Sequence, residues 1–239
     1  MLITGFPAAA FGTNCYVVAT GIGQECVVVD PGIEVLNQLD AVLDEHRVRP
    51  VAVLLTHGHL DHTYSVTPVC GARDVPAYLH PGDADMLRDP LGWLSPETKA
   101  MFQGRLSWTE PDDIRPMGDG DVLRLAGLEI TVDHAPGHTA GSVTFRLPED
   151  DEAPGVLLSG DLLFAGSIGR TDLPGGDDAV MQVSLATKVL TLPDELVVLP
   201  GHGPQTTIGR ERSTNPYLRR LAMVDLPAAG APAAPTRGM

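Results

Sequence analysis

Lysine is almost absent from this chain, and acidic residues outnumber basic ones. Of its 16 Lys and Arg residues only Lys99 and Lys188 are lysines, and with 31 Asp and Glu the formal net charge is -15. Nucleic-acid binding without sequence preference depends on Lys and Arg side chains that neutralise phosphates. We therefore expect no nucleic-acid partner, which disfavours a nuclease function.

Long apolar runs are also missing. No stretch of about 18 apolar residues occurs, and the start Met1-Leu2-Ile3-Thr4-Gly5 has no basic region ahead of an apolar one. Such segments mark membrane spans and secretory signals, so we expect no membrane partner and predict a cytoplasmic protein. The sequence also lacks a G-x-S-x-G elbow and a G-x-x-x-x-G-K-[ST] loop, so serine-hydrolase and P-loop chemistry are without their usual signals.

Cysteine is scarce. Cys15, Cys26 and Cys70 are an odd number without paired spacing. Cys15 and Cys26 fall in β-like apolar runs, where we expect buried free thiols. Free thiols fit a reducing cytoplasm.

What is present has the composition of one ordinary globular domain, with 43% hydrophobic and 20% charged residues. Linker-like composition appears only near the end, so we predict a single domain over residues 1–222 and a flexible Pro/Ala-rich tail over 223–239. Apolar spacing predicts helices over 34–47, 63–74, 178–192 and 206–221.

Residues 83–113 are the least patterned part of the chain, with Trp93, Phe102 and Trp108 spread among Pro and Gly. Functional pockets favour loops with apolar walls. This segment is therefore expected either to form a lid over a substrate or to pack as a satellite cluster.

A core strand leads into a cluster of metal-ligand side chains. Residues 51–55 (V-A-V-L-L) are a continuous apolar run typical of a buried strand, and His57, His59, Asp61 and His62 follow it closely. Neutral imidazole and carboxylate are ligands that zinc and similar divalent metals take. A single loop histidine is usually just solvated, but four such residues within six positions favour a metal site.

The same arrangement recurs at three later strand ends. The strand over 130–134 is followed by a Pro-Gly turn and His138, the strand over 155–160 by Asp161, and the strand over 196–199 by His202. One cluster cannot complete a metal shell alone. Ligands that recur in this way are what a shared site requires.

The T-H-x-H-x-D-H loop followed by single His, Asp and His ligands resembles the signature of the metallo-β-lactamase superfamily, over about Leu2 to Leu221. Segments 166–176 (G-S-I-G-R-T-D-L-P-G-G) and 200–209 (P-G-H-G-P-Q-T-T-I-G) are similar to short members of the glyoxalase II-like (hydroxyacylglutathione hydrolase-like) branch. The resemblance implies an αββα sandwich of two mixed β-sheets flanked by helices. The residue pattern alone indicates only a mixed α and β fold.

The resemblance also implies a dinuclear metal site. A first metal would be held by three histidines and a second by an aspartate and two histidines, with Asp161 bridging: His57, His59 and His138, then Asp61, His62 and His202. The expected cofactors are two divalent ions, with zinc first and iron or manganese as alternatives. Because such ions lower the pKa of a shared water, the implied reaction is attack of a metal-bridging hydroxide on a carbonyl carbon. Asp61 would also orient that nucleophile.

The implied substrate is a small-molecule thioester such as S-lactoylglutathione. Long members of the branch grip glutathione with a helical C-terminal domain, whereas only a short segment follows His202 here. The preference for Arg over Lys, with abundant Ala, Gly and Pro, is typical of a high-GC bacterial genome, and in an actinobacterium mycothiol could replace glutathione. Arg170 is a candidate for contacting substrate, or forms a structural ion pair with Asp172 or another acid.

Two other reaction classes remain open within the same fold. A persulfide dioxygenase holds a single iron with two His and one Asp, and it shares the G-R-T-D segment. A lactonase or β-lactamase would share the metal site and differ in the pocket. The complete second ligand set favours the hydrolase. The chain would be a monomer or a homodimer, with an N-terminal edge strand as one surface for pairing.

Four further residues near these motifs are not expected to bind metal. Asp30, in the D-P-G turn over 30–32, would support the site or form the turn. His46 at a helix end is expected to be solvated, and His80 to lie in a surface turn. His134 precedes His138 by four residues on an extended segment, so it faces elsewhere.

Overall fold

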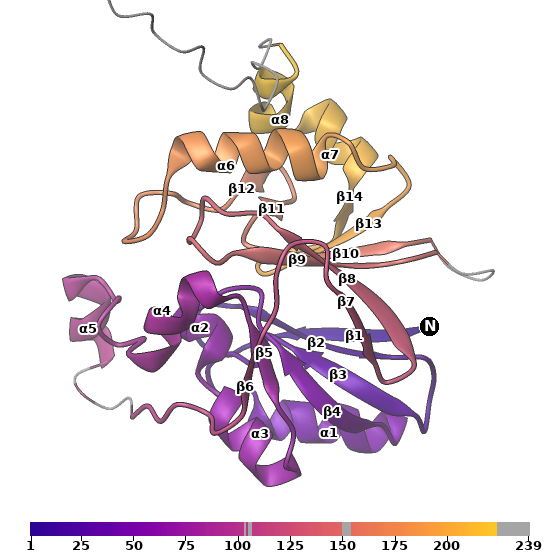
Figure 1. The fold of residues 1–239 in the computed structure, drawn as a ribbon, viewed down its shortest axis with the longest axis vertical. Coiled ribbons are helices and arrows are strands. Elements are labelled where there is room, and N and C mark those ends of the chain that lie inside the picture. The colour runs from indigo at the N-terminus through magenta and orange to yellow at the C-terminus, as the bar shows by residue number, and fades with distance from the viewer. Residues whose placement is uncertain (103, 105–106, 150–153, 224–239) are drawn as a thin grey trace, which may run out of the picture.

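Two six-stranded sheets lie face to face in the computed structural model, which describes residues 1–102, 104, 107–149 and 154–223 (Figure 1). The expected flexible tail lies outside the described residues from position 224 onward. The first sheet contains, in spatial order, β1 (Leu2–Pro7), β2 (Asn14–Ala19), β3 (Glu25–Val29), β4 (Arg49–Leu54), β5 (Ala77–Leu79) and β6 (Ile114–Pro116). The second contains β14 (Thr206–Thr207), β13 (Val197–Pro200), β10 (Val156–Gly160), β9 (Val143–Leu147), β8 (Leu128–His134) and β7 (Val122–Leu125).

Both sheets are mixed. In the first, β1, β2 and β3 pair antiparallel and β3 to β6 pair parallel. In the second, β10 and β13 are parallel and the other pairs antiparallel. Two short strands, β11 (Leu163–Phe164) and β12 (Ser167–Ile168), form a separate hairpin.

Helices cover the outer faces of the two sheets (Figure 1). Two of them, α1 (Leu36–His46) and α3 (Val66–Arg73), lie below the first sheet. Above the second sheet lie α6 (Asp178–Ser184) with its π-helical continuation Leu185–Val189, α7 (Ile208–Thr214) and α8 (Pro216–Leu221). The remaining helices lie toward one edge of the sandwich: α2 (Leu60–Thr63), α4 (Ala84–Arg88) and α5 (Pro96–Phe102). The αββα sandwich implied by the resemblance is therefore confirmed.

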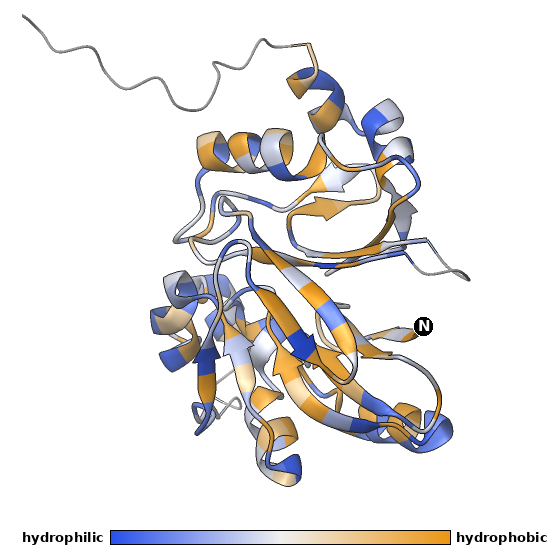
Figure 2. Cartoon of the chain, turned by 45° about the vertical axis from the view of Figure 1, so that its right-hand side comes forward, coloured by the Kyte–Doolittle hydropathy of each residue, from blue (hydrophilic) through white to orange (hydrophobic). Residues whose placement is uncertain are grey.

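The continuous apolar run at β4 is explained by burial on both faces. Val53 and Leu55 join the core between the first sheet and the helices α1 and α3, whereas Ala52 and Leu54 join the core between the two sheets. A strand covered on both faces has no position for a polar side chain, so alternation disappears. Figure 2 shows the consequence, with hydrophobic residues concentrated in the strands and mixed residues along the helices.

Two of the predicted helices are each divided in the structure. Over 63–74, Ser65 leaves the helical ladder because its backbone N–H and hydroxyl bond to the carbonyl oxygens of Pro31 and Gly32. Over 206–221, Thr206 and Thr207 pair with β13 as a strand, and Asn215 is extended. Pro216 follows Asn215, and a residue before proline is disfavoured in helical conformation.

The prediction of buried free thiols is confirmed for Cys15 and Cys26, and Cys70 is also a buried free thiol. Within the described part of the chain, no helix combines the length and apolar character needed to span a bilayer.

The tryptophans of the least patterned segment, 83–113, lie in two different places. Trp93 lines a cavity at the edge of the sandwich, described below. Trp108 instead packs against the core beneath the first sheet. The side chain of Phe102 lies outside the described residues. Trp93 therefore belongs to a cavity wall and Trp108 to the periphery of the main core. A lid over a substrate stays a prediction.

Candidate metal centre

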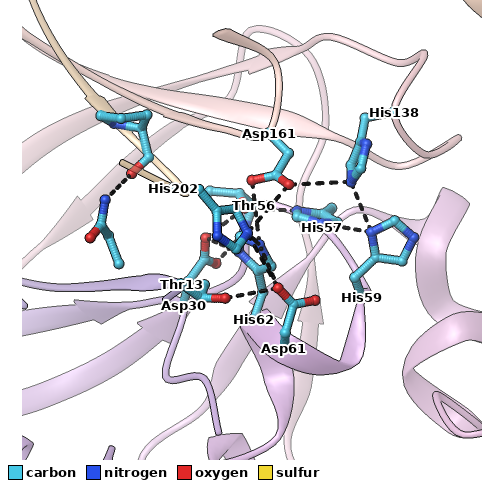
Figure 3. Close-up of polar contacts among 12 residues, drawn as sticks. Thr13, Asp30, Thr56, His57, His59, Asp61, His62, His138, Asp161 and His202 are labelled. Atoms are coloured by element: carbon cyan, nitrogen blue, oxygen red, sulfur yellow. Dashed lines mark hydrogen bonds and ion pairs between the residues drawn. The ribbon is translucent and has the colours of Figure 1, made fainter. Parts of the chain in front are cut away.

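The ends of four strands meet at one edge of the sandwich and present histidine and aspartate side chains to one another (Figure 3). The loop after β4 carries His57 and His59, and it runs into α2 with Asp61 and His62. The loops after β8, β10 and β13 carry one residue each: His138, Asp161 and His202. All seven residues named from the sequence are brought together.

Three histidine nitrogens form the first group. His59 Nδ1 lies 3.0 Å from His57 Nε2 and 2.8 Å from His138 Nε2. Ligand atoms placed tetrahedrally at a zinc–nitrogen distance of about 2.1 Å are separated by about 3.4 Å. The separations of the three nitrogens are thus close to those expected for ligands of one shared ion.

The second group contains one carboxylate oxygen and two nitrogens. His202 Nε2 lies 3.3 Å from Asp61 Oδ2 and 3.3 Å from His62 Nε2, and the separation between Asp61 Oδ2 and His62 Nε2 is 3.6 Å. This mixed nitrogen and oxygen set is also one that divalent metals take.

Asp161 lies between the two groups. Its Oδ1 is 3.4 Å from His62 Nε2, and its Oδ2 is 3.5 Å from His138 Nε2 and 3.6 Å from His202 Nε2. Oδ1 is buried and, among the described residues, has no hydrogen-bond donor. Burying a carboxylate oxygen that receives no hydrogen bond is costly unless a bound cation compensates its charge, so the residues present fit a metal centre.

Outer partners fix the orientation of three of the imidazole rings. His138 Nδ1 donates to the Arg170 carbonyl oxygen at 2.7 Å, because a carbonyl can only accept. His62 Nδ1 donates likewise to Asp30 Oδ2 at 2.9 Å. In their neutral forms both rings then keep a lone pair on Nε2, pointing into the centre, as metal ligation requires.

The Thr56 hydroxyl does the same for His57. It donates to Asp30 Oδ2 at 2.6 Å, so its oxygen is free to accept from His57 Nδ1 at 3.1 Å. The Thr56 backbone N–H also donates to Asp30 Oδ1 at 2.8 Å. Asp30 therefore holds the ring of His62 directly and that of His57 through Thr56, which is the supporting position expected of it from the sequence.

Burial favours the neutral forms of His57 and His59. The pKa of His57 is well below its usual value, first because of burial and then because of the neighbouring His62 and His138. The pKa of His59 falls to about 3 through burial and the nearby His138. Neutral imidazole is the form that binds metal.

The second group is charged differently. Burial alone would lower the pKa of His62, but Asp161, Asp61 and Asp30 raise it well above its usual value. Burial likewise opposes ionisation of Asp61 and Asp161, yet the facing histidines, His62 before the others, bring the pKa of each carboxyl below its usual value. The carboxylates thus favour the protonated form of His62.

A cavity of about 660 Å³ opens over the ligand side chains. His59, Asp61, His138, Asp161 and His202 lie on its lining. The rest of the lining is largely apolar and comes from both halves of the chain: Phe11, Leu60, Met86, Pro90, Trp93, Leu94, Phe164, Ile168 and Leu173, together with Ser95, Glu97, Thr98, Ser167 and Arg170.

Arg170 forms the ion pair that was one of the two roles considered from the sequence. It lines the cavity, and its guanidinium forms two hydrogen bonds with Asp172, at 2.7 and 2.8 Å. The ion pair is exposed, with 61% and 69% of the two side chains accessible. The structural pair is therefore present, and a substrate contact by Arg170 stays a prediction.

The three other histidines lie apart from the two groups. His134 stacks on His80, with ring centroids 4.0 Å apart, and bonds to the Ala140 carbonyl oxygen. His80 lies in a turn as predicted, where its Nδ1 accepts from Gly82 N–H. His46 lies at the end of α1, where it is partly exposed, and its Nε2 also lies 3.2 Å from Thr4 Oγ1.

Several supporting residues could not be recognised from their local sequence. Thr13 donates its hydroxyl to Asp61 Oδ2 at 2.8 Å. Asn14 and Tyr16 hold the loop that carries His202, and Asp83 contacts the loops of His57 and His138. Each acts on a residue more than 20 positions away, so no short motif contains it.

Comparisons with known proteins agree with this geometry. The family model for the metallo-beta-lactamase superfamily matches residues 8–202. An uncharacterized protein of Mycobacterium tuberculosis is 45% identical over 224 residues, which cover 93% of this chain and 100% of the relative. The hydroxyacylglutathione hydrolase GloC of Haemophilus influenzae is 33% identical over 232 residues, covering 91% of this chain and 98% of the relative.

Two solved structures have the same architecture. TTHA1623, crystallised in a di-iron-bound form, aligns with a TM-score of 0.74 and 40% identity, over 90% of this chain and 100% of its own. The B3 metallo-beta-lactamase BLEG-1 aligns with a TM-score of 0.75 and 35% identity, over 91% of this chain and 99% of its own. With two six-stranded sheets, the converging ligand loops and a family match over most of its length, the chain belongs to the metallo-beta-lactamase superfamily.

Proposed function

We propose that this protein is a dinuclear-metal hydrolase that cleaves a small-molecule thioester, such as a hydroxyacyl ester of a low-molecular-weight thiol. The observation that carries the proposal is the pairing of two ligand groups on either side of Asp161 at the floor of a largely apolar cavity. His57, His59 and His138 would hold one ion, Asp61, His62 and His202 the other, and Asp161 would bridge them. Zinc is the proposed metal, and the di-iron form of TTHA1623 makes iron the first alternative.

Two divalent ions in this position would lower the pKa of a shared water and polarise a carbonyl oxygen. The protein's own groups supply orientation. Asp61 Oδ2 accepts a hydrogen bond from the Thr13 hydroxyl, and Asp61 lies on the cavity lining. In that place Asp61 would accept a hydrogen bond from the attacking water and keep it aimed at the carbonyl carbon.

The cavity walls supply the environment. Met86, Trp93, Leu94 and Phe164 exclude water around the reacting bond, and electrostatic interactions strengthen in such surroundings. A thioester suits this pocket because its sulfur and acyl chain are apolar while its carbonyl is polar. Arg170 at the rim would contact a carboxylate or hydroxyl of the substrate.

The similarity to GloC supports a hydroxyacyl thioester of glutathione as the first substrate to test. The carrier thiol is a separate question, and mycothiol is the other candidate. Comparing the two lactoyl thioesters decides between them: faster turnover of the glutathione ester would remove the mycothiol alternative.

A second candidate is hydrolysis of a β-lactam, favoured by the 35% identity with BLEG-1. It would use the same ligands and differ in what the cavity admits. Cleavage of the β-lactam nitrocefin at a rate comparable to the thioesters would support it.

The experiment begins with metal content, measured by elemental mass spectrometry on protein purified without added metal. Nearly two ions per chain and hydrolysis of thioesters well above lactones and β-lactams would support the proposal. A single iron with oxygen uptake on a glutathione persulfide would contradict it and indicate a persulfide dioxygenase.

Variants of the ligands provide the second arm. His59→Ala and Asp161→Asn should abolish turnover and keep the fold, because both side chains lie in loops at strand ends. His46→Ala is the control, since His46 lies on α1 beneath the first sheet and bonds to Thr4. Full activity in either ligand variant would contradict the proposed site.

A further inference from the structure

We propose that Asp83 is a positioning residue which sets the distance between the two loops of the three-histidine group, and thereby whether that group can hold its ion. The inference rests on the metal centre of the proposed function. It concerns a residue outside the ligand set, and its test reads metal affinity and loop order rather than turnover.

The Asp83 carboxylate is 1% exposed and is surrounded by three donors. Its Oδ2 accepts from the backbone N–H of Gly58 at 2.9 Å and from the hydroxyl of Thr139 at 2.7 Å. Its Oδ1 accepts from the backbone N–H of Gly141 at 2.7 Å. A single side chain is thus bonded to two loops that belong to different sheets.

These donors are next to the ligands of one group only. Gly58 lies between His57 and His59 in the chain, and Thr139 follows His138. The loops are also joined directly on the other side of His57, where Val143 N–H donates to the Thr56 carbonyl oxygen at 2.8 Å. Asp83 adds a tie at Gly58 and Thr139, each adjacent in sequence to a histidine of the group, and the hydrogen bonds to it would control the separation of the imidazoles.

Both loops close on Asp83 without spare room. A Cβ added at Gly58 would lie 3.1 Å from Asp83 Cβ and 2.9 Å from Met86 Cβ. A Cβ added at Gly141 would lie 2.6 Å from Asp83 Cγ. Glycine at these positions lets the backbone N–H groups approach the carboxylate directly.

The position of Asp83 in its own segment points to the same role. It is the N-cap residue of α4, where an aspartate usually accepts from the helix, but its side chain makes no such bond. The carboxylate instead accepts hydrogen bonds from the two loops. The segment that follows supplies Met86 and Trp93 to the cavity wall, so Asp83 also anchors that wall to the metal centre.

The test compares metal binding by Asp83→Ala and Asp83→Asn with wild type. Metal-free protein is titrated with Zn²⁺ in competition with a chromophoric chelator, and His59→Ala and His202→Ala mark the loss of each group. We expect the Asp83 variants to resemble His59→Ala, with one site weakened by about 10- to 100-fold, the range for supporting residues of metal ligands. The other site should stay within about threefold of wild type.

The asparagine variant sharpens the chemistry. An amide has one oxygen and one NH₂ group in place of two carboxylate oxygens. Its NH₂ group would therefore face a donor from which Asp83 now accepts a hydrogen bond. Asp85→Asn is the matched control, because Asp85 lies two residues away, is 78% exposed and pairs with Arg88. It should bind zinc as wild type does.

A variant of Thr139, which donates to Asp83, still tests the proposal if the Asp83 variants fold poorly. Thr139→Val removes one hydroxyl of the network and retains the side-chain volume, and it should weaken the same site to a smaller extent. Amide hydrogen exchange in metal-free protein gives an independent readout: segments 57–59 and 137–142 should exchange faster in Asp83→Asn than in Asp85→Asn.

Unchanged zinc affinity in Asp83→Asn and Thr139→Val, equal weakening of both sites, or unchanged exchange in the two segments would each overturn the role of Asp83. Failure of the proposed function looks different. In that case the wild-type protein binds its metals and Asp83 still controls one site, but no thioester is hydrolysed.

Discussion

The hydroxyl of Tyr16, in β2 of the first sheet, donates a hydrogen bond of 2.8 Å to the carbonyl oxygen of Pro200, at the end of β13 in the second. Asn14 adds two bonds from its side chain, to Pro200 O at 3.0 Å and Gly203 O at 2.9 Å. The Asn14 backbone N–H donates to Gly201 O at 2.7 Å. The loop that carries His202 is therefore held by the opposite sheet.

Asn14→Ala should weaken the group that contains His202. Two side-chain hydrogen bonds are lost, each worth about 1 kcal/mol, so the free energy of unfolding should fall by about 1 to 2 kcal/mol. Zinc affinity of the second group should also fall, measured by titration of the metal-free protein. Asn37→Ala, at an exposed position of α1, is the control. Equal zinc affinity in the two variants would show that Asn14 does not position His202.

Gly201→Ala should damage the centre more than other glycine substitutions. A Cβ at Gly201 would lie 2.2 Å from Asp161 Oδ1 and 2.8 Å from His62 Cε1, so it would displace the proposed bridging ligand. We expect loss of at least one bound ion and of activity, checked by metal analysis. Gly71→Ala is the comparison, because an added Cβ there meets nothing within 4 Å. That variant sits in α3 and should keep its metals and gain slightly in stability. Two bound ions in Gly201→Ala would contradict the geometry at Asp161.

The ligands could be read from the sequence because each follows a strand directly. Residues 51–55 predict a buried strand, and the position of His57 and His59 beyond its end places them at the sheet edge. The supporting residues differ in kind. Thr13, Asn14 and Asp83 act across 25 to 189 positions of sequence, so their roles depend on how the two sheets face each other.

One predicted helix was wrong in its extent because tertiary contacts determine the local conformation there. Apolar spacing favoured one helix over 206–221, but Thr206 and Thr207 pair with β13 and Asn215 is extended before Pro216. The Pro216 signal was present in the sequence, whereas the pairing of a two-residue strand was not. Asp83 was not singled out from the sequence: an aspartate before a helix is typical of a cap, but this one bonds to the loops of His57 and His138.

Metal affinity should fall as the pH is lowered. The pKa values of His62 and His202 are raised in the metal-free chain, by Asp161 ahead of the other carboxylates at His62 and by Asp61 at His202, against the opposing effect of burial. An ion must displace those protons, so acidification through these raised pKa values favours the metal-free form. Zinc titrations across a pH series measure the effect.

Asp30→Asn tests the sign of that dependence. Removing one of the carboxylates that face His62 should lower the pKa of His62, so proton competition should begin at lower pH than in wild type. A shift to higher pH would contradict the assignment of His62 as the competing group.

Arg170→Ala should separate the two roles of this arginine. If Arg170 contacts substrate, the variant raises KM for the thioester and changes kcat less. The reason is that the lost contact would bind the substrate and the transition state equally. Asp172→Asn weakens the pair that now holds the guanidinium, so it should leave KM unchanged or lower it. Thermal stability of both variants should stay near wild type, since exposed ion pairs contribute about 0 to 1 kcal/mol. An unchanged KM in Arg170→Ala would favour the purely structural role.

The two tryptophans of the segment 83–113 should behave in opposite ways. Trp93 lines the cavity, so Trp93→Ala should raise KM and leave the free energy of unfolding nearly unchanged. Trp108 is partly buried against the core beneath the first sheet, so Trp108→Ala should lower that free energy by about 2 kcal/mol through lost packing. Its KM should stay as in wild type.

Chemical unfolding and steady-state kinetics on the same protein preparations distinguish these effects. Trp108→Phe is a useful intermediate, because the indole Nε1 of Trp108 is buried and, among the described residues, has no hydrogen-bond partner, so phenylalanine removes a polar atom at little cost. We expect its stability to lie much closer to wild type than that of Trp108→Ala. A raised KM in Trp108→Ala with unchanged stability would mean that this tryptophan, too, belongs to the substrate pocket.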